Sequence, residues 1–509
     1  MSAVTGVAAP TSWLHRRELA AYPSTGARRA YLLLVVAITV ALYYELYVGG
    51  GVATLMLEHF HMSFGYFVAI LAIGNLVGAF ASLLAGLCDR FGRANLVVYG
   101  LLIVGLMTLF AIPNAPDKLT YGVENAIVAL VEGVILVATP ALIRDFSPQV
   151  GRATAMGFWT IGPVLGSLMV SLLTTLTLDT FKTWESQFVI CGVIGLVVFV
   201  VAFLFLRELA PALRDQIMVS LRDRALVEAR ARGLDVVANL RAPFRQLLRL
   251  DIIGSALGVS VLLLFYYTAV AFGTIYLVII FHFTLSQANA LANWSWASNA
   301  VALIAAGMLS DRLRVRKPFM LVGGLGAAVL TALYLLQAGQ HPSWGTLVAL
   351  SCGQSILVAG AYATWMASFT ETIEACNPAL IATGLAIWGW LLRLVVTAAF
   401  LAIPHVIDTV TPLIESGPTL AALAQAQATH TAPSAGVMAQ LGIIQQAAAD
   451  APGQWQTWYW ICVAGILVFV ASVFIMRGRW SPAAARADEA AHDRAVAREM
   501  SRLEGAPAE

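Results

Sequence analysis

Long apolar stretches recur along the whole chain and limit the folds that it can adopt. Twelve such runs, of roughly 18 to 25 residues, lie between charged residues, prolines or glycines. An α-helix needs about 20 apolar residues to cross the hydrocarbon core of a bilayer, so each run is long enough to span a membrane. Only 11% of the residues are charged and 60% are hydrophobic, whereas charged residues make up roughly a quarter of a soluble domain. The sequence therefore excludes a soluble globule and predicts an all-α integral membrane protein.

The limits of the apolar runs give the predicted membrane spans. Because their number is even, both ends of the chain should lie on the same side of the membrane. The predicted spans are residues 32–57, 65–88, 94–112, 121–143, 154–175, 187–206, 252–280, 288–309, 318–337, 345–369, 379–403 and 458–476.

The distribution of Lys and Arg predicts which side that is. Of the 30 basic residues, 27 lie in segments on the same side as the N-terminus, Lys118 and Lys182 lie on the other side, and Arg393 lies within a span. Loops rich in Lys and Arg stay in the cytoplasm. The N-terminal segment has no small-residue cleavage site, so we expect a retained first helix and not a cleaved signal. We expect a multi-pass protein of the plasma (inner) membrane with both termini cytoplasmic.

The same pattern divides the chain into two membrane bundles. In the linker between them, residues 213–232 have helical spacing, and an interfacial helix and a plain solvated linker are equally open interpretations. A long Ala- and Gln-rich segment in the second bundle, 404–457, has no Lys or Arg and is predicted to be an external loop. The predicted units are a cytoplasmic tail at 1–30, a six-helix bundle at 31–206, a cytoplasmic linker at 207–250, a second six-helix bundle at 251–476 and a cytoplasmic tail at 477–509.

An internal repeat supports the division into halves. Residues 43–63 align without a gap on 266–286, at an offset of 223, and match at six positions that include Tyr43/Tyr266 and Gly50/Gly273. Parallel repeats joined by a cytoplasmic connector are a transporter architecture, with the substrate site between the halves near the midplane.

Two copies of one motif end the second and eighth predicted spans. The first reads Ala85-Gly-Leu-Cys-Asp-Arg-Phe-Gly-Arg93 and the second Gly307-Met-Leu-Ser-Asp-Arg-Leu-Arg314. They resemble the G-x-L-x-D-R-x-G-R signature of the major facilitator superfamily, although each copy is imperfect. The resemblance covers nearly the whole chain and implies a twelve-helix transporter that works by alternating access and needs no cofactor. Its gating residues would be Asp89, Arg90, Gly92, Arg93, Gly307, Asp311 and Arg312.

These motifs admit a second interpretation, as does a Gly-Pro element in span five. A latch that switching must break is favoured for the motif copies, while a turn that only anchors topology is the alternative. The span-five element resembles one that is common in the family's antiporters, although helix packing explains it fully. Its helix-packing residues are Gly157, Gly162, Pro163 and Gly166.

Three ionisable residues fall near the middle of predicted spans. Glu45 lies in span one, Glu132 in span four and Arg393 in span eleven. Such residues are costly in a membrane and usually mark a transport pathway. Burial favours the neutral form of a carboxylic acid, so Glu45 and Glu132 are candidates for proton coupling. A structural ion pair between either glutamate and Arg393 is the alternative interpretation.

Aromatic and amide side chains repeat at helical spacing near these depths. They could recognise a ring or a carboxylate, and they could equally bond neighbouring helices together. The candidate substrate-binding residues are Arg393, Tyr43, Tyr266, Tyr267, Asn293, Gln354, Trp365 and Trp390.

The combined sequence features favour a proton-coupled secondary transporter of a small organic solute. Arg393 favours an organic anion, as does Ala129, which stands where the family's exporters carry an arginine. Multidrug efflux is the alternative, and a non-transporting receptor or scaffold is a more remote one. The spans show no nucleophile–base pair, the five cysteines fit no metal-ligand spacing, and the net charge of +2 indicates no nucleic acid. We expect no enzyme activity, no metal and no cofactor, with a substrate, protons and the lipid bilayer as partners of a monomer.

Overall fold

The computed structural model describes most of the chain. The described residues are 17–82, 92–147, 160–210, 213, 246–376, 381–476, 480–483, 486, 487, 490, 491, 494 and 498. Three predicted motif residues, Asp89, Arg90 and Gly157, lie outside them. The predicted interfacial helix at 213–232 also lies outside them, apart from Leu213.

The N-terminal half consists of helices that follow the predicted spans closely. A π-helical turn, η2, and a short 3-10 helix, η3, continue α5. The elements are α1 (Thr25–Gly51), α2 (Ala53–His59), α3 (Phe64–Ala81), α5 (Arg93–Leu106), η2 (Met107–Ala111), η3 (Ile112–Asn114), α6 (Lys118–Phe146), α8 (Gly162–Phe181) and α9 (Trp184–Phe205).

The C-terminal half repeats this plan and adds two short helices before its last one. Its elements are α13 (Leu250–Leu262), α14 (Leu264–Phe281), α15 (Leu285–Leu313), α16 (Lys317–Leu335), α17 (Trp344–Cys376), α18 (Ile381–Val406), α19 (Val410–Ile414), α20 (Gly417–Ala428) and α21 (Ala435–Ile475).

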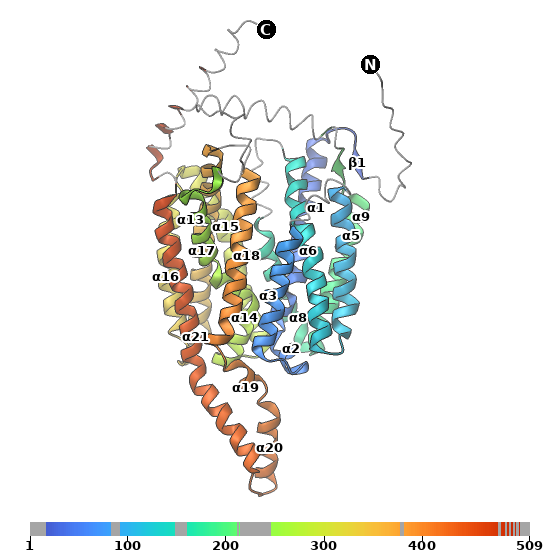
Figure 1. Ribbon diagram of the computed structural model, residues 1–509, viewed down its shortest axis with the longest axis vertical. Coiled ribbons are helices and arrows are strands. Elements are labelled where there is room, and N and C mark those ends of the chain that lie inside the picture. Colours follow the sequence, from blue (N-terminus) through green and yellow to red (C-terminus); the bar gives the residue numbers. More distant parts are fainter. Residues whose placement is uncertain are drawn as a thin grey trace.

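Eleven helical segments of the described chain are long and apolar enough to cross a membrane, with α13 and α14 forming one of them. The remaining predicted span corresponds to α15, which has 29 residues. This helix is less apolar because it carries Asn289, Asn293 and Asn299. The helices of each half lie together, and α3 and α18 run side by side where the halves meet (Figure 1). The predicted all-α membrane fold is therefore confirmed.

Helix starts follow local sequence signals. Ser63 and Thr183 accept hydrogen bonds from the first turns of α3 and α9, and Thr284 forms a capping box with Gln287 at the start of α15. Asp117 caps α6 by accepting bonds from two backbone N–H groups. The bond from Thr120 is the main reason why the pKa of the Asp117 carboxyl is lowered.

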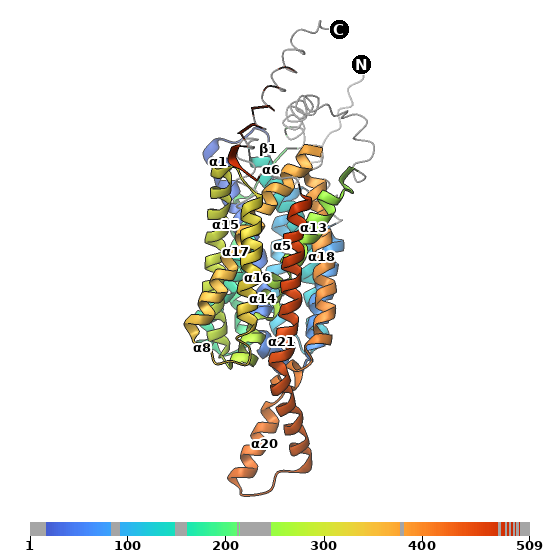
Figure 2. The ribbon, with the colours of Figure 1, turned by 90° about the vertical axis from the view of Figure 1, so that its left-hand side faces the viewer.

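The segment predicted as a loop at 404–457 is mostly helical. Helices α19 and α20 and the first part of α21 form a hairpin that projects beyond the rest of the bundle (Figures 1 and 2). Alanine, leucine and glutamine favour helix, which explains this departure from the prediction. No residue of α20 is buried. We call this side of the molecule the hairpin end and the opposite side the termini end.

A two-stranded parallel sheet at the termini end was not predicted. Strand β1 (Glu18–Leu19) pairs with β2 (Glu208–Leu209). The buried Arg17 donates to Asn95 Oδ1 at 3.1 Å and to the Phe203 carbonyl, while Glu208 Oε2 accepts from the Arg93 backbone N–H at 2.9 Å. The segment that precedes α1 and the start of the predicted linker are thus both fixed to the N-terminal half.

The hairpin provides a test of membrane orientation. Ala432 is exposed at its tip, and Ala21 is exposed at the termini end. In a cysteine-free background, Ala432→Cys should react with an impermeant maleimide in intact cells, because we expect the hairpin end to be external. Ala21→Cys should react only after the membrane is permeabilised. The reverse labelling pattern would contradict the predicted orientation.

Candidate functional site

Arg393 occupies a position between the two halves of the molecule. It lies on α18 and is half-buried. Its guanidinium interacts electrostatically with the hydroxyls of Tyr43 on α1 and Tyr267 on α14, and with the carboxyl of Glu132 on α6. Helices from both halves therefore converge on one cationic group.

Four tyrosines form a cluster beside this cation. The Tyr362 hydroxyl on α17 interacts electrostatically with those of Tyr43, Tyr266 and Tyr267. All four side chains are half-buried. The Tyr266 ring packs edge-on against Tyr267 and Trp296, with ring centroids 5.2 and 5.3 Å apart. We call these tyrosines and Arg393 the central cluster. It presents phenol hydroxyls, aromatic faces and a positive charge to one region.

Asn75 on α3 holds the backbone of α18 at Arg393. Its amide nitrogen donates to the Arg393 carbonyl at 2.9 Å and to Thr397 Oγ1 at 2.8 Å, and Arg393 Nη1 donates to the Asn75 carbonyl at 3.3 Å. Asn75 was not among the predicted site residues, although an amide in an otherwise apolar span is a detectable signal. These bonds join the two halves at mid-depth.

Arg393 has no close counter-ion in the described part of the chain. The ion pairs found there join Arg93 to Asp145, Arg249 to Asp251, and Arg316 to both Asp311 and Glu371. The alternative interpretation of Glu45 or Glu132 as a direct ion-pair partner of Arg393 is therefore not seen in this conformation. The positive charge remains available to an anion.

Glu132 and Glu45 are both buried, but in different surroundings. Glu132 is 1% exposed and interacts electrostatically with both Glu45 and Arg393. Glu45 is 4% exposed and faces Gly195 on α9, inside the N-terminal half. No described residue donates a hydrogen bond to either carboxyl group. A buried carboxyl group without a partner is far less costly when it is protonated.

The other predicted substrate-binding residues contact neighbouring helices or line a cavity. Asn293 donates to Thr175 Oγ1 on α8 at 3.1 Å. Trp365 is fully buried, and Trp390 packs edge-on against Phe80. These three therefore make packing contacts between helices. Gln354 instead lines a cavity of about 80 Å³ on the hairpin side of the central cluster.

Close contacts join the two halves towards the hairpin end. Thr274 Oγ1 donates to the Gly50 carbonyl at 2.7 Å, and Asn289 Nδ2 donates to the Gly51 carbonyl at 2.9 Å. A Cβ atom on Gly50 would lie 2.2 Å from the Val270 carbonyl oxygen. The glycines of span one therefore permit a backbone-to-backbone contact that closes this end.

The predicted packing element in span five is also used for close approach. A Cβ atom on Gly162 would lie 2.6 Å from Thr39 Cγ2, and one on Gly166 would lie 2.5 Å from Tyr43 Cβ. Pro163 lies in the first turn of α8, where proline is tolerated. Helix packing accounts for the described part of this element.

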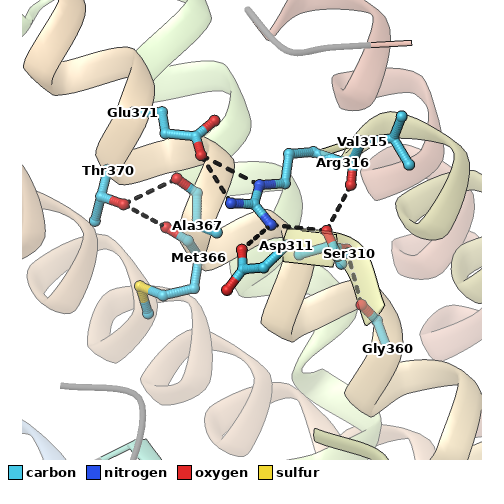
Figure 3. A network of polar contacts seen from close by, with 10 residues as sticks. Ser310, Asp311, Val315, Arg316, Gly360, Met366, Ala367, Thr370 and Glu371 are labelled. Atoms are coloured by element: carbon cyan, nitrogen blue, oxygen red, sulfur yellow. Dashed lines mark hydrogen bonds and ion pairs between the residues drawn. The ribbon is translucent and has the colours of Figure 1, made fainter. Parts of the chain in front are cut away.

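At the termini end, the ion pairs seen between described residues each join groups of the same half. Arg316 Nη1 pairs with Asp311 at 2.6 Å, and its Nη2 pairs with Glu371 on α17 at 2.9 Å (Figure 3). Burial lowers the pKa of Arg316, but Glu371 and Asp311 more than offset this, so its pKa is raised. In the other half, Arg93 Nη1 pairs with Asp145 at the end of α6 at 2.8 Å.

The internal repeat relates these two networks. Arg93 and Arg316 are separated by the same offset of 223 that aligns the halves. This offset was the signal from which Arg316, and then its carboxylate partners, could have been found.

The other predicted gating residues differ in their surroundings. Gly92 adopts a left-handed φ of 85°. A Cβ atom on Gly307 would meet no atom within 4 Å, and Arg312 is exposed.

Comparisons with known proteins agree with this architecture. The model of the Major Facilitator Superfamily matches residues 33–373. A cis,cis-muconate transport protein of Acinetobacter baylyi (strain ATCC 33305 / BD413 / ADP1) is 28% identical over 110 residues, which are 21% of this chain and 25% of that protein. The chain thus matches about a quarter of the length of this curated relative.

Solved structures resemble the chain over most of its length. A bacterial homologue of the human lysosomal transporter Spinster, in an inward-facing and unoccupied conformation, has a TM-score of 0.65 at 17% identity and covers 90% of this chain and 100% of its own. A D-xylose-proton symporter has a TM-score of 0.60 at 14% identity, covering 89% of this chain and 98% of its own. At these identities the likeness establishes the fold alone.

The contact at Gly50 predicts a conformational mutant. Gly50→Val should oppose closure of the hairpin end, at a cost of about 1–3 kcal/mol typical of overpacking, and should slow transport. Spin labels at the exposed residues Glu58 and Gln340 should then show a longer distance across that end. Gly49→Ala is the matched control, because its Cβ would lie 3.5 Å from the Tyr121 hydroxyl, an ordinary contact. Unchanged distances in Gly50→Val would exclude this role.

The network at Arg316 predicts a difference between neighbouring arginines. Arg316→Gln removes two ion pairs and a hydrogen bond to Ser310 Oγ. We expect the free energy of unfolding in detergent to fall by about 1 kcal/mol, because the carboxylates are partly exposed. Arg312→Gln alters an exposed side chain and should have little effect. Equal stabilities of the two variants would argue against a stabilising network.

Proposed function

Since the chain belongs to the Major Facilitator Superfamily and is therefore a multi-pass membrane transporter of small molecules and not an enzyme, we propose that its substrate is an organic anion and that protons drive transport. The observation that carries this proposal is the position of Arg393. Its guanidinium is within electrostatic range of tyrosines from both halves and of the buried Glu132, and it has no close counter-ion among the described residues.

An anionic substrate would supply the charge that Arg393 lacks. A guanidinium presents a planar fork of donors that matches a carboxylate, and such charge-assisted bonds are strong in a site of low polarity. Tyrosine hydroxyls could donate further bonds to the same carboxylate, while the rings contact the carbon skeleton. The partial similarity to a cis,cis-muconate transport protein supports a carboxylate substrate.

Glu132 would couple the anion to a proton. When Glu132 is ionised, it attracts Arg393 and competes with the substrate; when it is protonated, Arg393 is free to bind the anion. Proton binding therefore raises anion affinity, and by linkage the anion raises proton affinity to the same degree. A carrier that loads both ligands together is a symporter. Glu45, within electrostatic range of Glu132, would keep a second charge from accumulating there.

Alternating access would use the contacts between the halves. In this conformation the bonds at Gly50 and Gly51 close the hairpin end, which we propose to be external. Opening that end requires these bonds to break while new contacts form at the termini end. The ion pairs of Arg93 with Asp145 and of Arg316 with Asp311, each formed within one half, would contribute to the balance between the two conformations.

Multidrug efflux remains the alternative function. The aromatic side chains of the central cluster and the buried Glu45 would suit an apolar cation. Arg393 opposes this function because it would repel a cation at the same place. A test with both kinds of solute separates the two functions.

Variants of the charged residues test the proposed coupling. In proteoliposomes with an acidic exterior, the uptake of labelled cis,cis-muconate, adipate, hexanoate and benzoate would be measured. Glu132→Gln should abolish uphill uptake, because its neutral form is fixed, but exchange between two loaded sides should survive. Arg393→Lys should weaken binding and Arg393→Ala should abolish it, since only arginine offers the planar fork.

A third acid on α6 serves as the control for coupling. Glu124 is half-buried and eight residues before Glu132 on the same helix, so Glu124→Gln should retain uphill uptake. Glu45→Gln tests whether the carboxyl group in the N-terminal half takes part. Full proton-driven uptake in both Glu45→Gln and Glu132→Gln would remove the carboxylates from the mechanism.

A further inference from the structure

The cavity on the hairpin side of the central cluster is mostly apolar and contains a few polar side chains. Its volume is about 80 Å³, several times the room that one water needs. Helices of both halves line it, with Tyr47 and Ser171 from one half and Asn289, Trp296 and Gln354 from the other. It is therefore located where a substrate could contact both halves.

Gln354 is the side chain in this cavity with an unmet hydrogen-bonding requirement. It is only 2% exposed, and its amide nitrogen is fully buried and donates to no described residue. A buried donor without a partner costs about 1–3 kcal/mol, so the amide needs an acceptor within the cavity. The described residues that line the cavity place no acceptor within hydrogen-bond distance of this nitrogen.

The lining of the cavity limits what that acceptor can be. It contains no Asp, Glu, Lys, Arg or His among its residues. A second carboxylate placed there would lose its hydration without gaining a counter-charge, which is strongly unfavourable. An uncharged hydroxyl or carbonyl oxygen could instead accept from Gln354 while its carbon skeleton contacts the ring of Trp296.

The cavity and the central cluster are neighbours along the transport axis. Tyr47 lines the cavity, and its hydroxyl interacts electrostatically with those of Tyr43, Tyr266 and Tyr267 in the cluster. On α17, Gln354 precedes Tyr362 by eight residues, which is about 12 Å of helix. An elongated molecule could therefore have one end at Arg393 and the other in the cavity.

We propose that this cavity binds the neutral, hydrogen-bond-accepting end of the substrate, with Gln354 as the residue that selects it. The proposal rests on the function proposed above, in which Arg393 binds the anionic end. Together the two sites select an elongated monocarboxylate that carries a distal hydroxyl or carbonyl group. They disfavour dicarboxylates, in contrast to what similarity to a muconate carrier alone would indicate.

Three six-carbon acids that differ only at the distal end test this selectivity. Hexanoate ends in a methyl group, 6-hydroxyhexanoate in a hydroxyl and adipate in a second carboxylate. Their binding to the purified full-length chain would be measured by calorimetry near neutral pH. We expect 6-hydroxyhexanoate to bind about tenfold more tightly than either of the others, as one buried hydrogen bond would give.

Gln354→Leu is the informative variant, because leucine fills a similar space without donors or acceptors. It should remove the preference for 6-hydroxyhexanoate over hexanoate without lowering thermal stability, since it also removes an unpartnered buried amide. Gln456→Leu is the matched control. The Gln456 amide already donates to the Ala338 carbonyl at 3.0 Å outside the cavity, so this change should leave the preference intact.

The outcomes separate the two proposals. If the acids bind in an Arg393-dependent manner but Gln354→Leu leaves their relative affinities unchanged, water satisfies the amide and the role of the cavity is overturned while the anion proposal stands. If none of the three acids binds, or if binding is unaffected by Arg393→Ala, both the anion proposal and the role of the cavity are overturned.

Discussion

The hydrocarbon core of a membrane offers no hydrogen-bond partner to a peptide group, and the whole structure depends on this constraint. Each span must satisfy its own backbone, which restricts it to helix and leaves only the helix ends and the side chains to form specific contacts. Association between spans then relies on close packing and on occasional polar bonds. The contact of Gly50 with the Val270 carbonyl and the bonds made by Asn75 are examples of each.

The same constraint makes a buried polar side chain without a hydrogen-bond partner energetically costly. Asn75 and Asn289 donate across the interface between the halves and so stabilise this conformation. Glu132 and Gln354 are deeply buried, yet no described residue bonds to the Glu132 carboxyl or to the Gln354 amide nitrogen. In a packed protein such groups are costly unless a proton, a water or a substrate completes them. We propose that Glu132 and Gln354 bind ligands, whereas Asn75 and Asn289 stabilise this conformation.

The family, the all-α fold and the positions of the twelve helical segments could all be predicted from the sequence. Residues 404–457 were predicted only as an external loop, and the helices within this segment were not anticipated. Their Ala, Leu and Gln content was a usable helix signal. The proposed roles of Glu45, Glu132 and Arg393 stay predictions. Arg316 could have been found from the repeat offset. Asn75 could be recognised in the sequence as a polar residue within an apolar span, but the sequence does not identify Arg393 on α18 as its partner.

The sequence by itself determined the membrane environment and the succession of helices, because hydrophobicity, length and charge are properties of contiguous residues. Tertiary structure alone decided which polar side chains meet. Helical periodicity assigns Glu45 to one face of α1, but only packing directs that face to Gly195 on α9, away from the central cluster. Likewise, Gln354 and Trp365 lie on the same helix, and packing places one in a cavity and the other in a stack of aromatic rings. A contact between helices that are far apart in the chain depends on the shapes of both helices. The sequence pattern of one helix describes only its own surface and does not identify the helix that will pack against it.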